Sequence, residues 1–396
     1  DGRARRRHGA HQCLVREGEH DLLERAAAAG DDDDVHGRVG VELGERGGHL
    51  PRGLGALHGD FTTVAAVLDP VGDVVQQLGD RGINPDFLEL AKLGGEQALY
   101  VPWMQATYIM VASKEALSHL PEGASLESLT YDQLAAWGAK IQEATGERKL
   151  GFPAGPKGLL YRLFQGSLYP AYTGGVVRTF KSPEAVEMWT AFQTIWESTN
   201  PRSTSYDFMQ EPLLAGDVWV AFDHVARVIN ALRQKPDQFV AFPAPTGPKG
   251  LAYMPVLAGV AIPKGAPDRA AAAKLIEYLT RPEVQIATLR ETAFFPVVGT
   301  ELPGDLPEGL RLAAAAIEQQ VQAENAIASL LPVGLGEKNG EFNKVFTDAF
   351  QRIVVRGRDI QDSLDAEGEK LARIMEAADA ACWQPDAPSE GPCPVE

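Results

Sequence analysis

The sequence predicts an α/β protein with two lobes, and two observations lead to that prediction. From residue 61 onward, strand-like segments alternate with segments whose apolar residues recur at spacings of three and four, the pattern of an α/β fold. The chain has 396 residues, of which 44% are apolar. A chain of this length and composition can bury a large core and is expected to form two lobes or domains.

The first elements run from residue 100 to residue 146. The stretch YVPWMQATYIM (100–110) is typical of an apolar strand, and Ser113 is placed to cap a helix over 113–120. In the following helix, spacings of three and four put three residues on one apolar face, and Gly146 is placed to end it. These core positions are Leu134, Trp137 and Ile141.

The middle of the chain continues the alternation. A short strand and turn (149–158) precede an aromatic helix that ends at Gly174 and Gly175. A helix over 182–196 has a serine cap, a proline at its first position and an apolar face. That face consists of Val186, Trp189, Phe192, Ile195 and Trp196.

The next strand ends in polar residues. After a turn at Gly216 and Asp217, the strand VWVAF ends at Asp223 and His224, and a helix follows from Val225. Polar residues at the carboxyl end of a buried strand mark the place where open α/β sheets bind ligands. This region continues with a strand and a proline-rich crossing, followed by a second apolar strand and an alanine-rich helix.

Charge and hydropathy exclude several classes of protein. The formal net charge of −17 argues against binding to nucleic acid or to an anionic membrane, since phosphate binding needs a basic surface. No apolar run reaches the roughly 18 to 20 residues that span a bilayer, and the first residues show no apolar signal-peptide core. We therefore expect a soluble chain, or one already processed.

Residues 1–60 differ from the rest in composition. They contain no Phe, Tyr or Trp, and no lysine appears before Lys92. Six histidines and the acidic run 31–34 lie here, but no metal-ligand spacing supports a metal site. A solvated segment without a core is one interpretation, and an out-of-frame translation of a GC-rich gene is the other.

Two of the three cysteines lie in a C-terminal loop rich in Pro, Ser and Gly. Cys382 and Cys393 are expected to form a disulfide, which indicates an oxidising compartment. The alternative is two unpaired thiols in a frayed tail, and Cys13 has no evident partner.

Several motifs in one order resemble extracellular solute-binding protein family 1, the sugar-type receptors of ABC importers. They are LLAGDVWVAF, then FPAPTGPKG, then AIPKGAPDRAAAAKLIEYLTRPEVQ, then AFFPVVG, and the resemblance runs from about residue 80 to about residue 375. It implies a two-lobed fold of the class II periplasmic-binding-protein type, with a ligand cleft between hinge-linked lobes. Residues 1–60 match nothing in the family's usual first lobe.

The resemblance also implies a division of the chain. Lobe 1 is expected to contain 61–110 and 258–328, and lobe 2 to contain 111–257 and 329–396 with the C-terminal helices and tail. Two segments are expected to cross between the lobes, namely 100–113 and 240–258.

The first crossing carries candidate ligand contacts. Trp103 offers a flat apolar face to a sugar ring, and Gln105 and Thr107 offer hydrogen bonds. A sugar site needs an apolar surface for the face of the ring and hydrogen bonds for the hydroxyl groups. Each desolvated hydroxyl left without a hydrogen bond costs about 1 to 3 kcal/mol. Tyr108 is a further candidate, and the alternative is that Trp103 and Tyr108 belong to the core.

Other candidates follow from the same resemblance. On the aromatic helix, Gln165 and Tyr169 share a face with Tyr161 or Arg162. Asp223 can accept two hydroxyl hydrogen bonds, although a helix N-cap is as natural a role for it. The remaining candidates are His224, Tyr253, Glu341 and Phe342.

The predicted function is a substrate-binding protein that captures a sugar or polyol by lobe closure and delivers it to the permease of an ABC importer. We expect a monomer in the periplasm or on the outer face of the cell membrane, with a lipid anchor as an option, and no metal or cofactor. The alternatives are a glycan-active enzyme or a ligand-free adhesion module on the same fold. No GxSxG, GxGxxG, GxxxxGK, HExxH or CxxC motif supports an enzyme.

Overall fold

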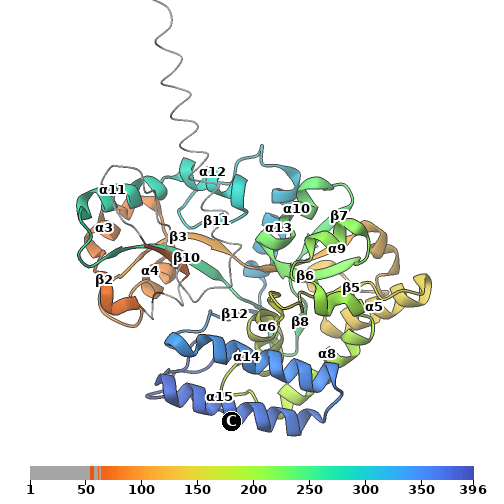
Figure 1. Ribbon diagram of the computed structural model, residues 1–396. Coiled ribbons are helices and arrows are strands. Elements are labelled where there is room, and N and C mark those ends of the chain that lie inside the picture. The colour runs from red at the N-terminus through yellow and green to blue at the C-terminus, as the bar shows by residue number, and fades with distance from the viewer. Residues whose placement is uncertain (1–53, 58–60, 62–63) are drawn as a thin grey trace, which may run out of the picture. The chain divides into compact units, whose positions relative to one another are not determined.

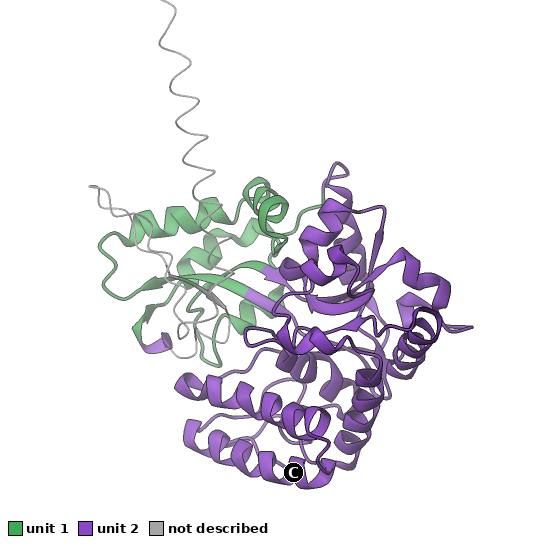
Figure 2. Cartoon of the chain, turned by 45° about the vertical axis from the view of Figure 1, so that its right-hand side comes forward, with its two compact units in different colours: residues 1–56, 67–104, 258–302 green, residues 57–66, 105–257, 303–396 purple. Residues whose placement is uncertain are grey.

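The structure is a computed structural model that describes residues 54–57, 61 and 64–396. The chain divides into two compact units (Figure 2). From residue 67 onward, unit 1 contains Val67–Met104 and Ala258–Leu302, and unit 2 contains Gln105–Leu257 and Pro303–Glu396. Each unit is therefore assembled from separate stretches of sequence. The predicted lobe 1 contains 61–110 and 258–328, whereas residues 105–110 and 303–328 belong to unit 2.

Unit 1 is built on a sheet of five strands (Figure 1). Four strands follow the order β1-β10-β3-β11, and β2 pairs antiparallel with β10, with Asp69 opposite Ile262. The strands are β1 (Leu54–Leu57), β2 (Leu68–Asp69), β3 (Val101–Ala106), β10 (Val256–Pro263) and β11 (Phe295–Pro296). The helices are α3 (Gly72–Gln77), α4 (Pro85–Leu90), α11 (Arg269–Leu279) and α12 (Pro282–Thr292). The alanine-rich helix that the sequence predicts is α11.

Unit 2 contains two sheets. The larger has the order β5-β6-β4-β7, and its strand β4 runs antiparallel to both neighbours. These strands are β4 (Tyr108–Ser113), β5 (Leu150–Gly151), β6 (Val220–His224) and β7 (Phe239–Phe242). The smaller has the order β12-β9-β8, with β8 (Thr246–Gly247), β9 (Gly250–Tyr253) and β12 (Ala326–Ala328). Burial along β4 and β6 explains why both strands are nearly continuous apolar runs.

The helices of unit 2 begin and end largely where local signals predict. Thr130 caps α5 through a capping box, and Gly146 ends it in the left-handed conformation. Ser182 caps α8, as predicted. The helices are α5 (Tyr131–Thr145), α6 (Leu160–Leu163), α7 (Tyr169–Thr173), α8 (Pro183–Glu197), α9 (Gln210–Ala215), α10 (Val225–Gln234), α13 (Glu308–Gln322), α14 (Asn339–Phe350) and α15 (Ile360–Ala378). The segment after Ser113 is a 3-10 helix, Lys114–His119.

The stretch 100–110 forms strand, as predicted, but the structure interrupts it at Thr107 and so divides it into β3 and β4. At this residue the hydroxyl Oγ1 donates to Met254 O (2.9 Å), and the carbonyl oxygen accepts from Val225 N (3.0 Å). Thr107 therefore bonds to the connection between β9 and β10 and to the first residue of helix Val225–Gln234, instead of to a neighbouring strand.

An aromatic core fills unit 2 between α7, α8 and α14. Trp189 Nε1 donates to the Tyr169 hydroxyl (3.0 Å), which donates to Phe180 O (3.2 Å). Phe164 packs on Trp189 with ring centroids 4.5 Å apart. The predicted core positions Leu134, Trp137, Ile141, Trp189, Phe192 and Ile195 are buried, whereas Val186 and Trp196 are partly exposed.

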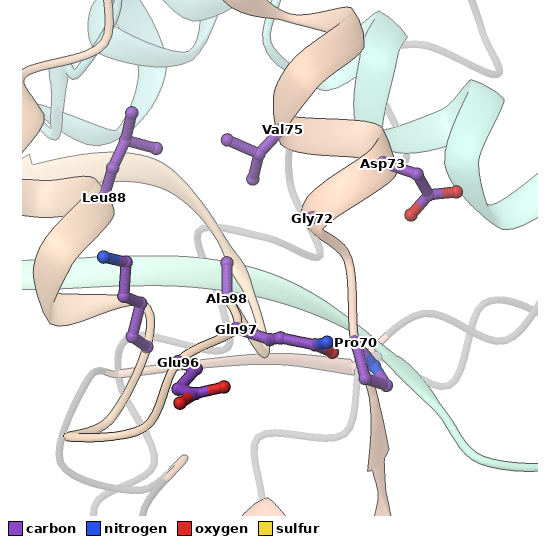
Figure 3. A pocket seen from close by; sticks show the side chains of 9 residues that line it. Pro70, Gly72, Asp73, Val75, Leu88, Glu96, Gln97 and Ala98 are labelled. Atoms are coloured by element: carbon purple, nitrogen blue, oxygen red, sulfur yellow. The ribbon is translucent and has the colours of Figure 1, made fainter.

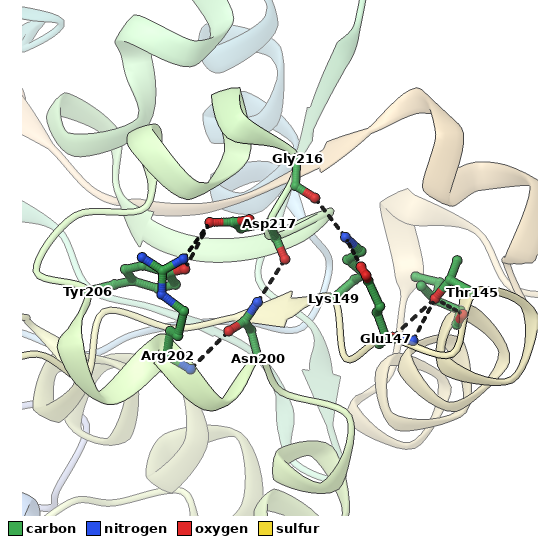
Figure 4. A network of polar contacts seen from close by, with 9 residues as sticks. Thr145, Glu147, Lys149, Asn200, Arg202, Tyr206, Gly216 and Asp217 are labelled. Atoms are coloured by element: carbon green, nitrogen blue, oxygen red, sulfur yellow. Dashed lines mark hydrogen bonds and ion pairs between the residues drawn. The ribbon is translucent and has the colours of Figure 1, made fainter.

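A polar network at the surface fastens the predicted turn at Gly216 and Asp217 (Figure 4). Asp217 Oδ2 accepts from Arg202 Nη1 (3.1 Å) and from the Tyr206 hydroxyl (3.3 Å), and Lys149 Nζ donates to Gly216 O (2.9 Å). Because these groups are partly solvent-exposed, the network adds little stability, but it fixes the point at which the chain enters β6.

The C-terminal tail is fastened to unit 2. Cys382 and Cys393, the pair that the sequence predicts, form a disulfide. Within the loop that this bond closes, the Asp386 carboxylate accepts three backbone hydrogen bonds of 2.9 to 3.0 Å from residues 176–178. Trp383 packs against Phe342 with ring centroids 5.5 Å apart. The tail is thus a structural part of unit 2.

Some predictions lie outside the described residues. These are the interpretation of residues 1–60, apart from the short strand β1, and the unpaired Cys13. Among the described helices, none has both the length and the apolar character needed to cross a membrane.

We expect the double variant Cys382→Ser, Cys393→Ser to lower the unfolding free energy by about 2 to 3 kcal/mol, because the bridge closes a short loop and restricts the unfolded chain. Urea unfolding of the oxidised protein and the variant measures this difference. Wild type under reducing conditions serves as the control and should match the variant. Equal stability of all three samples would contradict the prediction.

Candidate functional site

The register between β4 and β6 brings two predicted residues together in unit 2. Tyr108 lies opposite His224, with ring centroids 5.1 Å apart in an edge-to-face arrangement. Tyr108 also stacks on Phe222 at 5.6 Å. Both Tyr108 and His224 are buried, so the two rings form a fixed platform at this end of the sheet.

Asp223 is fully buried at the same strand end. Its two carboxyl oxygens accept from backbone groups, Oδ1 from His224 N (2.7 Å) and Oδ2 from Met209 N (3.0 Å). The helix-cap role that the sequence allows for Asp223 is wrong, because His224 occupies that position. His224 Nδ1 accepts from Ala226 N (3.3 Å) and caps α10.

Burial changes the charge state of this pair. It raises the pKa of the Asp223 carboxyl from 3.8 to about 7, although the nearby Arg227 opposes the change. Burial, followed by the charge of Arg227, lowers the pKa of His224 from 6.5 to about 3. His224 is therefore neutral at pH 7, and Asp223 holds its proton to a much higher pH than an exposed carboxyl does.

Arg227, one turn into α10, is buried beside this pair. Its Nη1 donates to Lys157 O (3.0 Å) and to Asp207 O (3.3 Å), and its guanidinium lies 4.5 Å from the centre of the Phe208 ring. A buried guanidinium with carbonyl partners keeps its charge and supplies a positive field to the strand end.

A second polar chain runs through the π-helix Phe164–Leu168 and the turn before it. Arg162 Nη1 donates to Gln165 Oε1 (3.0 Å), and Gln165 Nε2 donates to Asn343 Oδ1 on α14 (3.1 Å). Arg162 is partly exposed and lies over the Tyr161 ring at 5.0 Å, whereas Gln165 is only 1% exposed. Single-turn π-helices occur often at functional sites.

Thr107 belongs to a buried network that links three stretches of unit 2. Gln320 on α13 donates through Nε2 to Thr107 Oγ1 (3.3 Å) and to Tyr108 O (3.4 Å). Its Oε1 accepts from Ala244 N (3.0 Å). Thr107 therefore has a structural role in holding the start of β4.

The two candidates before Thr107 are accessible. Trp103, in unit 1, is partly exposed, and its carbonyl oxygen accepts from Gln285 Nε2 (2.7 Å). Its indole Nε1 is buried and has no hydrogen-bond partner within the part of the chain that the structure describes. Gln105 and Tyr253, in unit 2, are also partly exposed.

Three predicted ligand-binding residues belong to none of the polar networks described above. Tyr169 and Phe342 are fully buried in the aromatic core, where neighbouring rings cover them and leave no surface for a ligand. Glu341 is exposed and pairs with Lys338 at 2.6 Å. The Tyr169 hydroxyl bonds to Phe180 and Trp189.

Unit 1 has a cavity of about 520 Å³ that contains none of the predicted residues (Figure 3). Asp73 on its wall is paired with Arg269 at 2.7 Å, and Lys92 is paired with Glu89 at 2.5 Å. The cavity is lined by Pro70, Gly72, Asp73, Val75, Leu88, Lys92, Glu96, Gln97 and Ala98. No three His, Cys, Asp or Glu side chains among the described residues are grouped to hold a metal ion.

Sequence reasoning missed three residues of these networks. Arg227 had a usable signal, because an arginine in the first turn of a helix that begins just after Asp223 lies close enough in sequence to be its charge partner. Gln320 and Asn343 had no signal in the sequence, because glutamine and asparagine side chains on helices usually face solvent. Only the fold brings them to Thr107 and Gln165.

Comparison with known proteins gives one family and many structures of similar fold. The model of the family described as bacterial extracellular solute-binding protein matches residues 54–286, which is more than half of the chain. No curated protein sequence matches.

Three solved structures show the likeness in fold. Maltose-bound MalE3 of T. maritima has a TM-score of 0.66 and 18% identity over 81% of this chain and 83% of that chain. MalE of Xanthomonas citri, a sugar-binding protein, has a TM-score of 0.65 and 17% identity over 81% and 83%. UgpB of Mycobacterium tuberculosis, solved with glycerophosphocholine, has a TM-score of 0.66 and 17% identity over 84% and 85%. The predicted periplasmic-binding-protein type of α/β fold is confirmed.

Single substitutions in the Asp223 and His224 pair should give pH dependences of opposite sign. In His224→Asn, which keeps the helix cap, Asp223 binds its proton more tightly when folded, so the unfolding free energy should fall as pH rises from about 4 to about 7. In Asp223→Asn, His224 binds its proton more weakly when folded, so the unfolding free energy should fall as pH drops from about 6.5 to about 3.

Each slope is at most about 1.4 kcal/mol per pH unit, measured by urea unfolding across the pH range. In wild type the two effects oppose each other between about pH 4 and 6.5, so the pair should contribute little net pH dependence there. The double variant is the control and should also lack both slopes. Slopes of the same sign in the two single variants would refute the assigned charge states.

Proposed function

Because the chain belongs to the family of bacterial extracellular solute-binding proteins, the non-catalytic receptors of ABC importers, we propose that it captures a sugar or related polyol and delivers it to the membrane subunits of an importer. The match of the family model over residues 54–286 is the observation that carries this proposal. The Cys382–Cys393 disulfide supports a location outside the cytoplasm, in the periplasm or on the outer face of the membrane.

The ligand class is supported by the proteins of similar fold. Two of them are described as maltose-bound or sugar-binding, and one holds glycerophosphocholine, a phosphate diester of a polyol. Sugars and polyol esters share a dense set of hydroxyl groups, which a site must match with polar side chains next to an apolar surface.

The described residues include an apolar ring surface and several polar side chains that are partly exposed. Trp103 provides a partly exposed indole, and Gln105, Arg162 and Tyr253 provide partly exposed polar side chains. Asp223 and His224 form a buried pair in unit 2 whose protonation is shifted by burial. In this proposal the exposed side chains contact the ligand, while Thr107, Tyr108 and Gln165 hold the others in place.

Capture is proposed to occur by closure of the two lobes. From residue 67 onward, the chain passes between the units at 104, 257 and 302, and such connections can act as hinges. A ligand that contacts both lobes favours the closed state by its differential affinity for that state. The closed form then presents the surface that the importer recognises.

A ligand screen tests the function directly. We expect a sugar or polyol to raise the melting temperature, and at a hundred times its Kd the added stability is about 2.7 kcal/mol. Small-angle scattering should then show a smaller radius of gyration with that ligand bound. Failure of every sugar and polyol to stabilise the protein would favour the ligand-free adhesion module, and turnover of an oligosaccharide would favour an enzyme.

Trp103→Ala separates ligand contact from core packing. If the indole stacks on the ligand, this variant should bind about ten- to a hundredfold more weakly, while the unliganded melting temperature changes little. The matched control is Trp189→Ala, which empties a core position and should cost about 3 to 5 kcal/mol of stability without ligand. Equal loss of stability in both variants would assign Trp103 to the core.

A further inference from the structure

Arg162 has an unbalanced positive charge at an accessible position. Within the described part of the chain it forms no ion pair, and its two neighbours are neutral, the Gln165 amide oxygen at 3.0 Å and the Tyr161 ring at 5.0 Å. A guanidinium has five N–H donors, and the hydrogen bond to Gln165 uses one of them. The partly exposed side chain therefore has donors left for a ligand.

The position of this guanidinium is fixed by buried groups. Gln165 accepts the Arg162 hydrogen bond, donates to Asn343 Oδ1 (3.1 Å), and through its carbonyl oxygen accepts from Ser329 Oγ (2.8 Å). Gln165 and Ser329 are both buried. Because its partner cannot turn away, Arg162 is oriented in advance, which lowers the entropy cost of binding a ligand.

No carboxylate in the described part of the chain forms an ion pair with this guanidinium. Both oxygens of Asp223 accept backbone N–H groups, and burial holds the pKa of this carboxyl at about 7. Glu341 pairs with Lys338 at 2.6 Å. Arg162, Arg227 and the Asp223 carboxyl all act electrostatically on the hydroxyl of Tyr108, the two arginines in the opposite sense to Asp223.

We propose that the ligand is a sugar or polyol with an anionic group, and that Arg162 binds this group. The anionic group is a phosphate ester or a carboxylate. This inference rests on the proposed function. A guanidinium matches both anions because its parallel N–H groups can donate two hydrogen bonds to two oxygens at once. A neutral hydroxyl offers a single oxygen, so it would leave the charge of Arg162 without a counterion.

Matched pairs of probes test this assignment by isothermal titration calorimetry. The pairs are glycerol 3-phosphate against glycerol and glucuronate against glucose, with inorganic phosphate as the minimal anion. We expect at least one anion to bind wild type, and to bind at least about tenfold more tightly than its neutral counterpart. The phosphate and glucuronate arms distinguish the two anionic groups. Binding should weaken as ionic strength rises.

Substitutions of Arg162 test whether this residue is responsible for anion binding. Arg162→Gln should weaken anion binding about ten- to a hundredfold, and Arg162→Lys should weaken it less, because lysine keeps the charge but not the paired donors. The control is Arg356→Gln, which removes the same charge from an exposed position after the π-helix Gln351–Val355. It should bind like wild type, and melting temperatures without ligand verify that all variants fold.

Two results would overturn the inference. One is that none of the three anions binds wild type, and the other is that Arg162→Gln and Arg356→Gln bind the anion equally well. Neither result bears on the proposed function, which is judged by the neutral probes and the wider sugar panel. If glucose or another neutral sugar binds tightly and the anions do not, the solute-binding function stands and the anionic ligand is rejected.

Discussion

The buried amide of Gln320 is the constraint on which the candidate site in unit 2 depends. It joins Thr107, Tyr108 and Ala244, and Thr107 in turn holds Met254. Each of these groups is buried, and a buried polar group without a partner costs about 1 to 3 kcal/mol. The network therefore fixes where β4 begins, and through the β4–β6 register it fixes the position of His224 and Asp223.

Burial at this strand end changes which protonation states are favoured. It favours the protonated form of Asp223, whereas the two backbone N–H groups that donate to its oxygens favour the carboxylate. Burial also favours the neutral form of His224, whose Nδ1 accepts the hydrogen bond that caps α10. The arginines Arg162 and Arg227 keep their charges because guanidinium groups do not deprotonate. A low-dielectric surrounding strengthens the electric field of such charges.

Much of the fold could be predicted because its signals are local. Ser182 and Gly146 mark helix ends by their own conformational preferences, and the order of motifs indicates the family. The break at Thr107 could not be predicted, since it depends on Met254 and Gln320, which lie 147 and 213 residues away. The burial of Tyr169 and Phe342 could not be predicted either, because only the packed structure shows which neighbouring rings cover these side chains.

The interleaving of the two units affects the order in which the chain can fold. Strand β3 ends at residue 106, but its sheet neighbours β10 and β11 begin only at residues 256 and 295. At about 5 to 20 residues per second, synthesis takes roughly 8 to 30 seconds to reach β10 and roughly 10 to 40 seconds to reach β11. Until then the edges of β3 are unpaired, and unpaired strand edges promote aggregation. We therefore expect aggregation of the half-made chain to depend on how these strand edges are protected during synthesis, a step that the stability of the finished protein does not control.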